Sequence, residues 1–227
     1  MNSNSIPLHV GFIMDGNRRW ARKENLTANE GHLAGYNTIL EVAEWCRSKG
    51  IKIISIYAFS MENKKRNKLE IKGIIDLFKI GIIDNLNRFI KEGVKLNIIG
   101  KRDDLPLAVK KLISMAELKT KDGKESVINV AFNYSGRSEI INSVKEIESS
   151  KESLTEENLS RHLYTKGLAD PDLIIRTGGQ KRLSNFMLWQ SAYSEFYFTD
   201  CLWPDFDKSE LQKALNFYSE TKRNFGA

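Results

Sequence analysis

The densest set of anion donors in this sequence lies between residues 176 and 184. Two arginines six residues apart, two adjacent glycines and a serine hydroxyl share this stretch: Arg176, Gly178, Gly179, Arg182 and Ser184. Guanidinium groups bind phosphate oxygens through forked, charge-assisted hydrogen bonds, and glycine lets the backbone approach a ligand closely. A flexible connector would explain so many donors poorly, so the stretch predicts a cradle for a diphosphate group.

A second candidate is the segment Asp15-Gly16-Asn17-Arg18-Arg19, which follows the apolar run 9–14. A carboxylate at the end of a buried strand can hold Mg²⁺ through oxygen, and neighbouring backbone N–H groups can face an anion. On spacing alone, a turn formed by Asp and Asn is the favoured interpretation. The chain contains neither a Walker A sequence nor GxGxxG, so the ordinary nucleotide-binding motifs are absent.

Three further places carry polar groups that could serve a ligand. His32 opens a helical pattern and could donate to a diphosphate, although a lone histidine is more often structural. An apolar run is followed by the segment Ser60-Met61-Glu62-Asn63-Lys64-Lys65-Arg66. This segment either orients a substrate or forms a solvated basic loop. Arg66 and Glu70 lie on a stretch that could close over a ligand. Glu195 begins an aromatic strand and is a candidate second metal ligand.

The elements that must position these groups alternate between strand and helix patterns. Six runs rich in Ile, Val, Phe and Tyr are predicted as strands: His9–Met14, Lys52–Phe59, Lys95–Ile99, Val127–Asn133, Leu173–Arg176 and Glu195–Thr199. Helical spacing is found around 33–43 and 71–90, from Pro106 onward and over 207–223. The alternation predicts one α/β domain over 1–227, with a mostly parallel six-stranded central sheet flanked by helices. In such sheets, ligands bind outside the carboxyl ends of the strands, where the loops named above should meet.

The predicted helix over 71–90 is apolar on more than one side. Its main stripe runs from Ile74 to Ile90, while Leu77, Ile80 and Ile83 lie off that stripe. A fully buried helix is the simpler explanation, and a helix that walls an apolar tunnel is the functional one. The sequence is consistent with both.

Bulk composition limits the class of protein without choosing its ligand. The 227 residues carry 41% hydrophobic and 28% charged side chains and a net charge of +6, which suits an anionic ligand, nucleic acid or an acidic membrane surface. Two cysteines without CxxC spacing predict neither a disulfide nor a zinc site. The polar N-terminus has no signal-peptide pattern and no apolar run reaches the length of a membrane span, so we expect a cytoplasmic protein that meets a membrane, if at all, from one side.

At this point the sequence resembles one family, the cis-prenyltransferases, which include undecaprenyl diphosphate synthase and dehydrodolichyl diphosphate synthase. The resemblance spans about 9–226 and rests on several motifs in the same order: 9–20, Gly31-His32, Tyr57-Ala58-Phe59-Ser60, Glu62-Asn63, Asn133-Tyr134, 170–186, Leu188-Trp189-Gln190, Phe198-Thr199-Asp200 and Trp203-Pro204-Asp205-Phe206. So many long motifs in order make coincidence implausible.

The resemblance implies the chemistry and assigns roles to residues. It implies Mg²⁺-dependent condensation of isopentenyl diphosphate onto an allylic primer, farnesyl diphosphate, giving a long-chain Z-polyprenyl diphosphate that is delivered to a membrane. Asp15 and Glu195 would bind Mg²⁺, and Asp15 and Asn63 would be catalytic. The substrate-binding residues implied are Gly16, Asn17, Arg18, Arg19, Trp20, His32, Ser60, Met61, Glu62, Lys64, Arg66, Arg176, Arg182, Leu183 and Ser184. Family members form homodimers in which the C-terminal segment, here 223–226, can complete the partner's site.

Departures from the family pattern keep two other classes open. Ala28 stands where the family has arginine, Lys64 where it often has tryptophan, and Asn67 where it usually has proline. A non-catalytic prenyltransferase-like subunit of a heteromeric complex is therefore the main alternative, although Asp15 and Glu195 are present. Nucleic-acid binding would require exposed aromatic residues among the basic ones, whereas these aromatics lie inside apolar runs, so we expect no nucleic acid. Product length depends on tunnel depth, which the sequence does not give.

Overall fold

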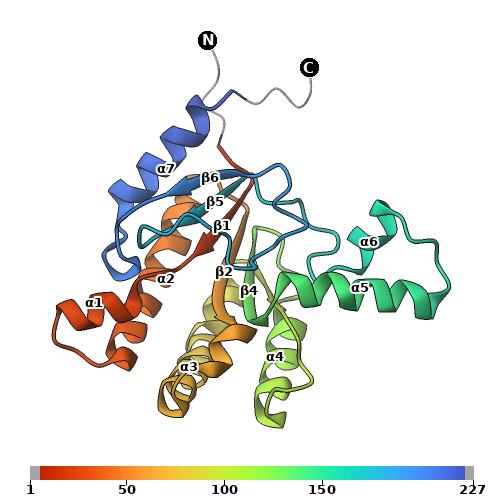
Figure 1. Cartoon of the computed structure of the whole chain (residues 1–227), viewed down its shortest axis with the longest axis horizontal. Helices are drawn as coiled ribbons and strands as arrows, with labels where there is room; N and C mark the ends of the chain where they lie inside the picture. The colour runs from red at the N-terminus through yellow and green to blue at the C-terminus, as the bar shows by residue number, and fades with distance from the viewer. Residues whose placement is uncertain (1–5, 223–227) are drawn as a thin grey trace.

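The structure is a computed structural model that describes residues 6–222 and contains one six-stranded sheet (Figure 1). The strands are β1 His9–Ile13, β2 Ile53–Ser60, β3 Val94–Ile99, β4 Ser126–Tyr134, β5 Leu173–Arg176 and β6 Glu195–Phe198. All neighbours pair in parallel, in the order β3-β4-β2-β1-β5-β6. The six predicted strands and the α/β class are confirmed.

Seven α-helices and two short 3₁₀ helices connect the strands within the described residues. They are α1 Asn17–Lys23, α2 Ala28–Ser48, η1 Met61–Lys65, α3 Lys68–Lys91, α4 Leu107–Thr120, α5 Gly136–Ser150, α6 Glu156–His162, η2 Trp203–Asp205 and α7 Lys208–Glu220. A capping box of Thr27 with Glu30 begins α2, and the Asp207 side chain caps α7. Pro106 stands just before α4, in extended conformation, rather than in its first turn. Residues 223–226, which the family resemblance assigned to a partner's site, lie outside the described residues.

Strand alternation gives the two faces of the sheet different partners. One face carries residues such as Phe12, Ile56 and Val130 into a large apolar core with α2, α3, α4 and α7. The opposite face carries Ile13, Ala131 and Ile174 into a smaller cluster with Phe186 and Met187 of the β5–β6 connection. Because side chains point alternately to the two faces of a strand, each strand contributes to both cores. We call these the helix face and the loop face.

The loop face also holds a ladder of polar side chains across four strands. His9 Nδ1 donates to the Ala169 carbonyl (2.7 Å), so its Nε2 accepts from the Ser55 hydroxyl (2.8 Å). Ser55 accepts from Asn129 Nδ2 (2.9 Å), and Asn129 Oδ1 accepts from Asn97 (3.0 Å). His9, Ser55 and Asn129 have no exposed surface. Burial lowers the pKa of His9 to about 4, which keeps the ring neutral near pH 7.

The helix α3 departs from the simpler expectation of complete burial. Leu77 faces the helix-face core region, but the Ile80 and Ile83 side chains are 44% and 59% exposed. Within residues 6–222, no helix has the length and apolarity needed to cross a bilayer. Cys46 is a buried free thiol and Cys201 is a half-buried one.

Candidate active site

The carboxyl ends of β1 and β5 are locked together at Asp15. The Thr177 hydroxyl donates to the Asp15 carbonyl (2.7 Å) and accepts from the Asp15 N–H (3.0 Å), and the Trp203 N–H also donates to that carbonyl (3.1 Å). Gly16 follows with a φ of 121°, a conformation that L residues rarely adopt, and then α1 begins. The backbone therefore turns sharply and fixes the Asp15 carboxylate at the rim of the sheet.

Two arginines hold that carboxylate from both sides. Arg176 Nη2 bonds Asp15 Oδ2 at 2.8 Å, and Arg19 Nη2 bonds Asp15 Oδ1 at 3.2 Å. Gly178 makes room for Arg19, since a Cβ there would lie 2.2 Å from its guanidinium. Arg176 is only 4% exposed, and its Nε has no hydrogen-bond partner within residues 6–222. A buried guanidinium N–H without an acceptor leaves one donor for a water, an ion or a ligand oxygen.

The connection after β5 is held in a strained shape by Asn185. Ser184, Asn185 and Met187 all have positive φ, between 42° and 68°. The Asn185 amide donates to Glu62 (2.9 Å) and Ser135 (2.7 Å), and its oxygen accepts from the Arg137 N–H (2.9 Å). This bracing presents the Ser184 hydroxyl to Arg176 Nη1 at 2.8 Å, and Arg176 also donates to the Arg182 carbonyl.

A buried carboxylate, Glu70, gathers the cations expected to bind phosphate. His32 Nε2 lies 3.0 Å from Glu70 Oε1, Arg66 Nη1 3.1 Å and Arg18 Nε 3.8 Å. Burial would raise the pKa of Glu70, but the bond to His32 and the two arginines hold that pKa below its usual value. Burial likewise lowers the pKa of His32, against the opposing effect of Glu70. The group thus places three donors around one anion before any ligand is present.

In the segment after β2, residues 60–66, polar side chains stabilise the local backbone. Ser60 Oγ accepts from the Asn63 N–H and Asn63 Oδ1 accepts from the Ser60 N–H, both at 3.2 Å, which caps η1. Burial would raise the pKa of Glu62, but the hydrogen bond from Asn185 helps to hold it below its usual value. Met61, which follows Ser60 in this segment, is half-buried.

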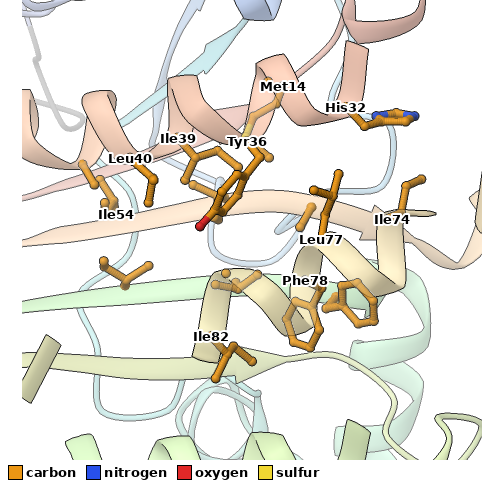
Figure 2. Close-up of a pocket in the computed structure, with 18 of the residues that line it drawn as sticks. Met14, His32, Tyr36, Ile39, Leu40, Ile54, Ile74, Leu77, Phe78 and Ile82 are labelled. Atoms are coloured by element: carbon orange, nitrogen blue, oxygen red, sulfur yellow. The ribbon is translucent and has the colours of Figure 1, made fainter. Parts of the chain in front are cut away.

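Some of these groups line a polar cavity that adjoins an apolar one. The polar cavity has a volume of about 350 Å³ and is lined by Met14, Asp15, Gly16, Asn17, Arg18, Arg19, Arg22, His32, Tyr57, Ala58, Asn63 and Arg66. The apolar chamber of about 150 Å³ lies between α2, α3 and the helix face of the sheet, with Tyr36, Leu77 and Phe78 among its walls (Figure 2). Met14, Asn17, His32 and Ala58 line both. An anionic head and an apolar tail of one molecule could therefore occupy the two together.

The chamber ends near a hydrogen bond between two helices. Asn85 Nδ2 on α3 donates to the Tyr36 hydroxyl on α2 (3.0 Å) and to the Gly81 carbonyl (2.9 Å). Tyr36 lines the chamber, whereas Asn85 lines a smaller cavity of about 40 Å³ that shares Leu40, Ala43, Ile54, Phe89 and Ile128 with it. The bond therefore lies where the chamber meets the smaller cavity. The expected apolar tunnel stays a prediction, because the structure shows an apolar chamber with a smaller cavity beside it.

Several residues expected at the site have other surroundings. The Trp20 indole donates to Asp205 (2.7 Å), and Lys64 forms an ion pair with Asp104 (3.0 Å) instead of facing the polar cavity. Leu183 packs in the loop-face cluster, and Arg182 is exposed with its guanidinium on Gln180. These four residues do not line the polar cavity, and the same holds for the predicted residues Ser60, Met61, Glu62, Arg176 and Ser184.

Glu195 is a correction to the expected metal site. It pairs with Leu173 at the amino end of β6, whereas the Asp15 partner Arg176 pairs with Phe198 at the carboxyl end. Asp15 lies two residues beyond the strand position paired with Arg176, so Glu195 is offset by five residues, about 16 Å along the sheet. Within one chain, the parallel register therefore keeps the two carboxylates apart.

Asp15 alone still fits a metal shared with a ligand. Its side chain is 31% exposed and lines the polar cavity. Magnesium is commonly held by one or two carboxylates together with substrate phosphates and waters. Over 6–222 there is no cluster of three or more His, Cys, Asp or Glu suited to a metal, so a cation here would take its other ligands from phosphate oxygens.

Sequence reasoning named Arg22 as a possible substitute for the phosphate donor missing at Ala28, but it did not assign roles to Tyr57, Thr177 or Asn185. Arg22 and Tyr57 line the polar cavity, Thr177 fixes Asp15, and Asn185 braces the β5–β6 connection. Asn185 carried a usable signal, because asparagine is among the residues that tolerate positive φ. Thr177 carried none, since its role depends on β1 and β5 being neighbours.

Comparison with known proteins agrees with this geometry. Residues 13–226 match the family described as "Putative undecaprenyl diphosphate synthase". The chain is 41% identical to an isoprenyl transferase of Fusobacterium nucleatum over 98% of this chain and 96% of that protein. It is 42% identical to the tritrans,polycis-undecaprenyl-diphosphate synthase (geranylgeranyl-diphosphate specific) of Pyrococcus horikoshii, over 100% and 89%.

A solved structure shows the same fold. Lavandulyl diphosphate synthase from Lavandula x intermedia, in complex with dimethylallyl diphosphate, superposes with a TM-score of 0.92 at 32% identity, over 98% of this chain and 99% of that one. The chain belongs to this prenyltransferase family and is a prenyl-transferring enzyme.

Proposed function

We propose that the chain is a Mg²⁺-dependent cis-prenyltransferase that adds isopentenyl diphosphate units to an allylic primer, farnesyl diphosphate. The product would be a long-chain Z-polyprenyl diphosphate such as undecaprenyl diphosphate. The observation that carries this proposal is the junction of a cation-lined polar cavity with an apolar chamber, four residues being common to both. Burying each five-carbon unit would contribute roughly 4 kcal/mol, at ~0.8 kcal/mol per CH₂.

The primer would lie with its diphosphate in the polar cavity and its tail in the chamber. Gly16, Asn17, Arg18, Arg19 and His32 are the proposed primer-diphosphate ligands. Mg²⁺ held by Asp15 and diphosphate oxygens would offset charge on the leaving group. A diphosphate entering here would compete with Glu70 for Arg18, His32 and Arg66, so those donors are already gathered when it arrives.

Isopentenyl diphosphate would lie beside Arg176, with Arg182, Ser184, Ser60, Glu62 and Arg66 around it. The unpartnered Arg176 Nε would donate to its diphosphate. In the reaction, the allylic carbon–oxygen bond breaks and diphosphate leaves, while the terminal carbon of isopentenyl diphosphate forms the new carbon–carbon bond. A proton is then lost and a Z double bond forms. Asn63 is a neutral amide and a poor base, so it positions the substrate or relays the proton.

The proposal extends to assembly and destination. We expect a homodimer, as in the family, and delivery of the product to a membrane. A non-catalytic subunit is the competing function, and the retained Asp15–Arg176 pair argues against it.

The test is incorporation of labelled isopentenyl diphosphate into farnesyl diphosphate by the purified chain alone. We expect incorporation with Mg²⁺, loss of incorporation with EDTA, and recovery when Mg²⁺ is added back. Incorporation only after a second protein is supplied would instead support the subunit function. Reversed-phase sizing of the dephosphorylated product gives its length, and sedimentation gives the oligomeric state.

A further inference from the structure

The helix α3 has an outward apolar stripe that neither the core nor the chamber explains. Its inner side, which includes Leu77 and Phe78, lines the chamber. Its outer side carries four exposed aliphatic residues: Leu69 (72%), Ile80 (44%), Ile83 (59%) and Ile90 (46%). Their separations of eleven, three and seven residues return to the same side of a helix, so the four form one stripe.

Basic residues accompany this stripe. Lys72 lies on it, three residues after Leu69, and Lys68 and Lys91 flank it, all with exposed side chains. Asp76, seven residues after Leu69, also lies on the stripe and forms an ion pair with Lys79 at 2.6 Å. Residues 61–125, which span η1 to the start of β4, contain 16 Lys and Arg against 10 Asp and Glu, so this segment carries the whole net charge of +6.

The neighbouring helix α4 extends the same character. It packs against α3, and both lie at the lower end of the view in Figure 1. Leu107 and Leu118 of α4 are 66% and 65% exposed. Lys111, four residues after Leu107, and Lys119, next to Leu118, are exposed as well. Both helices therefore expose aliphatic side chains together with lysines.

This composition fits a bilayer better than a protein partner. Protein interfaces are enriched in aromatic residues and depleted of lysine at their centre, whereas this stripe has aliphatic residues and lysines, and Phe78 and Phe89 face inward. Amphipathic helices that lie on membranes place aliphatic residues in the acyl boundary and lysines against anionic headgroups.

We propose that the α3 stripe, Leu69, Ile80, Ile83 and Ile90 with Lys72 and Lys91, docks this protein on the surface of an anionic phospholipid bilayer. The chamber wall and the bilayer contact would then be two sides of one helix. Binding itself does not depend on catalysis, so it is tested apart from the proposed function.

The experiment is flotation of the full chain with vesicles of phosphatidylglycerol and phosphatidylcholine, compared with vesicles of phosphatidylcholine alone. We expect the protein to float with the anionic vesicles and not with the neutral ones. Lys72→Glu/Lys91→Glu should lower the vesicle-bound to free ratio by about tenfold or more, because each basic residue near an anionic surface contributes to attraction. Ile80→Ser/Ile83→Ser should lower it similarly.

The matched control is Ile141→Ser/Lys145→Glu on α5, where Ile141 is 58% exposed and Lys145 is also exposed. This variant should bind as the unmodified chain does. The proposal is overturned if the unmodified chain ignores anionic vesicles, if the α3 variants bind equally well, or if the control loses as much. It is also overturned if the α3 variants change the sedimenting mass, because the stripe would then be an interface between copies. Thermal melts confirm that each variant is folded.

Discussion

The two faces of the sheet are built from the same strands yet do different work. On the helix face, successive strands contribute Ile54, Ile56 and Val130 to the walls of an apolar chamber. On the loop face, the alternate residues of those strands, Ser55 and Asn129, form a fully buried polar ladder. A chamber needs smooth apolar walls, whereas a ladder of directional hydrogen bonds specifies register. Because side chains alternate along each strand, the chamber and the hydrogen bonds that align the strands lie on opposite faces of the sheet.

The largest effect is expected at the rim, where both faces meet. Asp15→Asn keeps the shape of the side chain but removes the charge that would hold Mg²⁺, so kcat should fall by about a thousandfold, equivalent to several kcal/mol. Steady-state rates measure this, and far-ultraviolet circular dichroism checks the fold. Activity within a few-fold of the unmodified chain would remove Asp15 from the mechanism.

The next effect contrasts adjacent residues of β2 on opposite faces. Ser55→Ala leaves His9 Nε2 and Asn129 Nδ2 without a partner, so the free energy of unfolding should fall by about 2–5 kcal/mol. The control Ile56→Val, facing the chamber, should cost about 0.5–1.5 kcal/mol. Urea unfolding measures both, and equal losses would mean that the ladder contributes nothing special.

The ladder should also make stability depend on pH. The folded pKa of His9 is about 4 against 6.5 unfolded, so the unfolded chain binds more protons between these values. Stability is complete above pH 6.5 and is lost as pH falls toward 4, by about 2 kcal/mol between pH 7 and pH 5. Urea titrations at the two values measure this for the unmodified chain and for His9→Asn. A variant with the same pH dependence would assign it to other groups.

The smallest energetic effect concerns the end of the chamber. Tyr36→Phe and Asn85→Leu remove one interhelical hydrogen bond, at about 1 kcal/mol of stability. In these two variants the aromatic ring at position 36 is no longer held by Asn85 and can move aside, and in Tyr36→Ala the ring is absent. All three variants should therefore shift the product toward longer chains. Product sizing measures the shift, with Ile141→Ser as a control on α5. Unchanged or shorter products from all three would place the length limit elsewhere.

Much of this architecture could be predicted because it depends on local pattern. Six apolar runs gave six strands within about a residue at each end, and parallel strands bring their carboxyl ends to one rim. Asp15, Arg176 and Ser184 therefore converge as expected, although Asp15 precedes Arg176 by 161 residues.

What failed depended on long-range register. Glu195 begins a short strand, and only its pairing with Leu173 shows that it lies at the far end of the sheet from Asp15. The family resemblance predicted that Lys64 binds substrate, whereas in the structure its ammonium group forms an ion pair with Asp104 in the β3–α4 connection. The exposed side of α3 could not be separated from a buried one by periodicity, because both of its sides are apolar.

The most direct test of the account is which face receives the isoprenoid tail. A photoreactive allylic diphosphate, with a benzophenone at the end of its apolar chain, would be irradiated on the enzyme and the labelled peptides mapped by mass spectrometry. The account predicts labelling within 28–48 and 68–91, the two helices that wall the chamber, and its suppression by farnesyl diphosphate. Labelling concentrated in 136–194 on the loop face, or labelling that farnesyl diphosphate does not suppress, would contradict it.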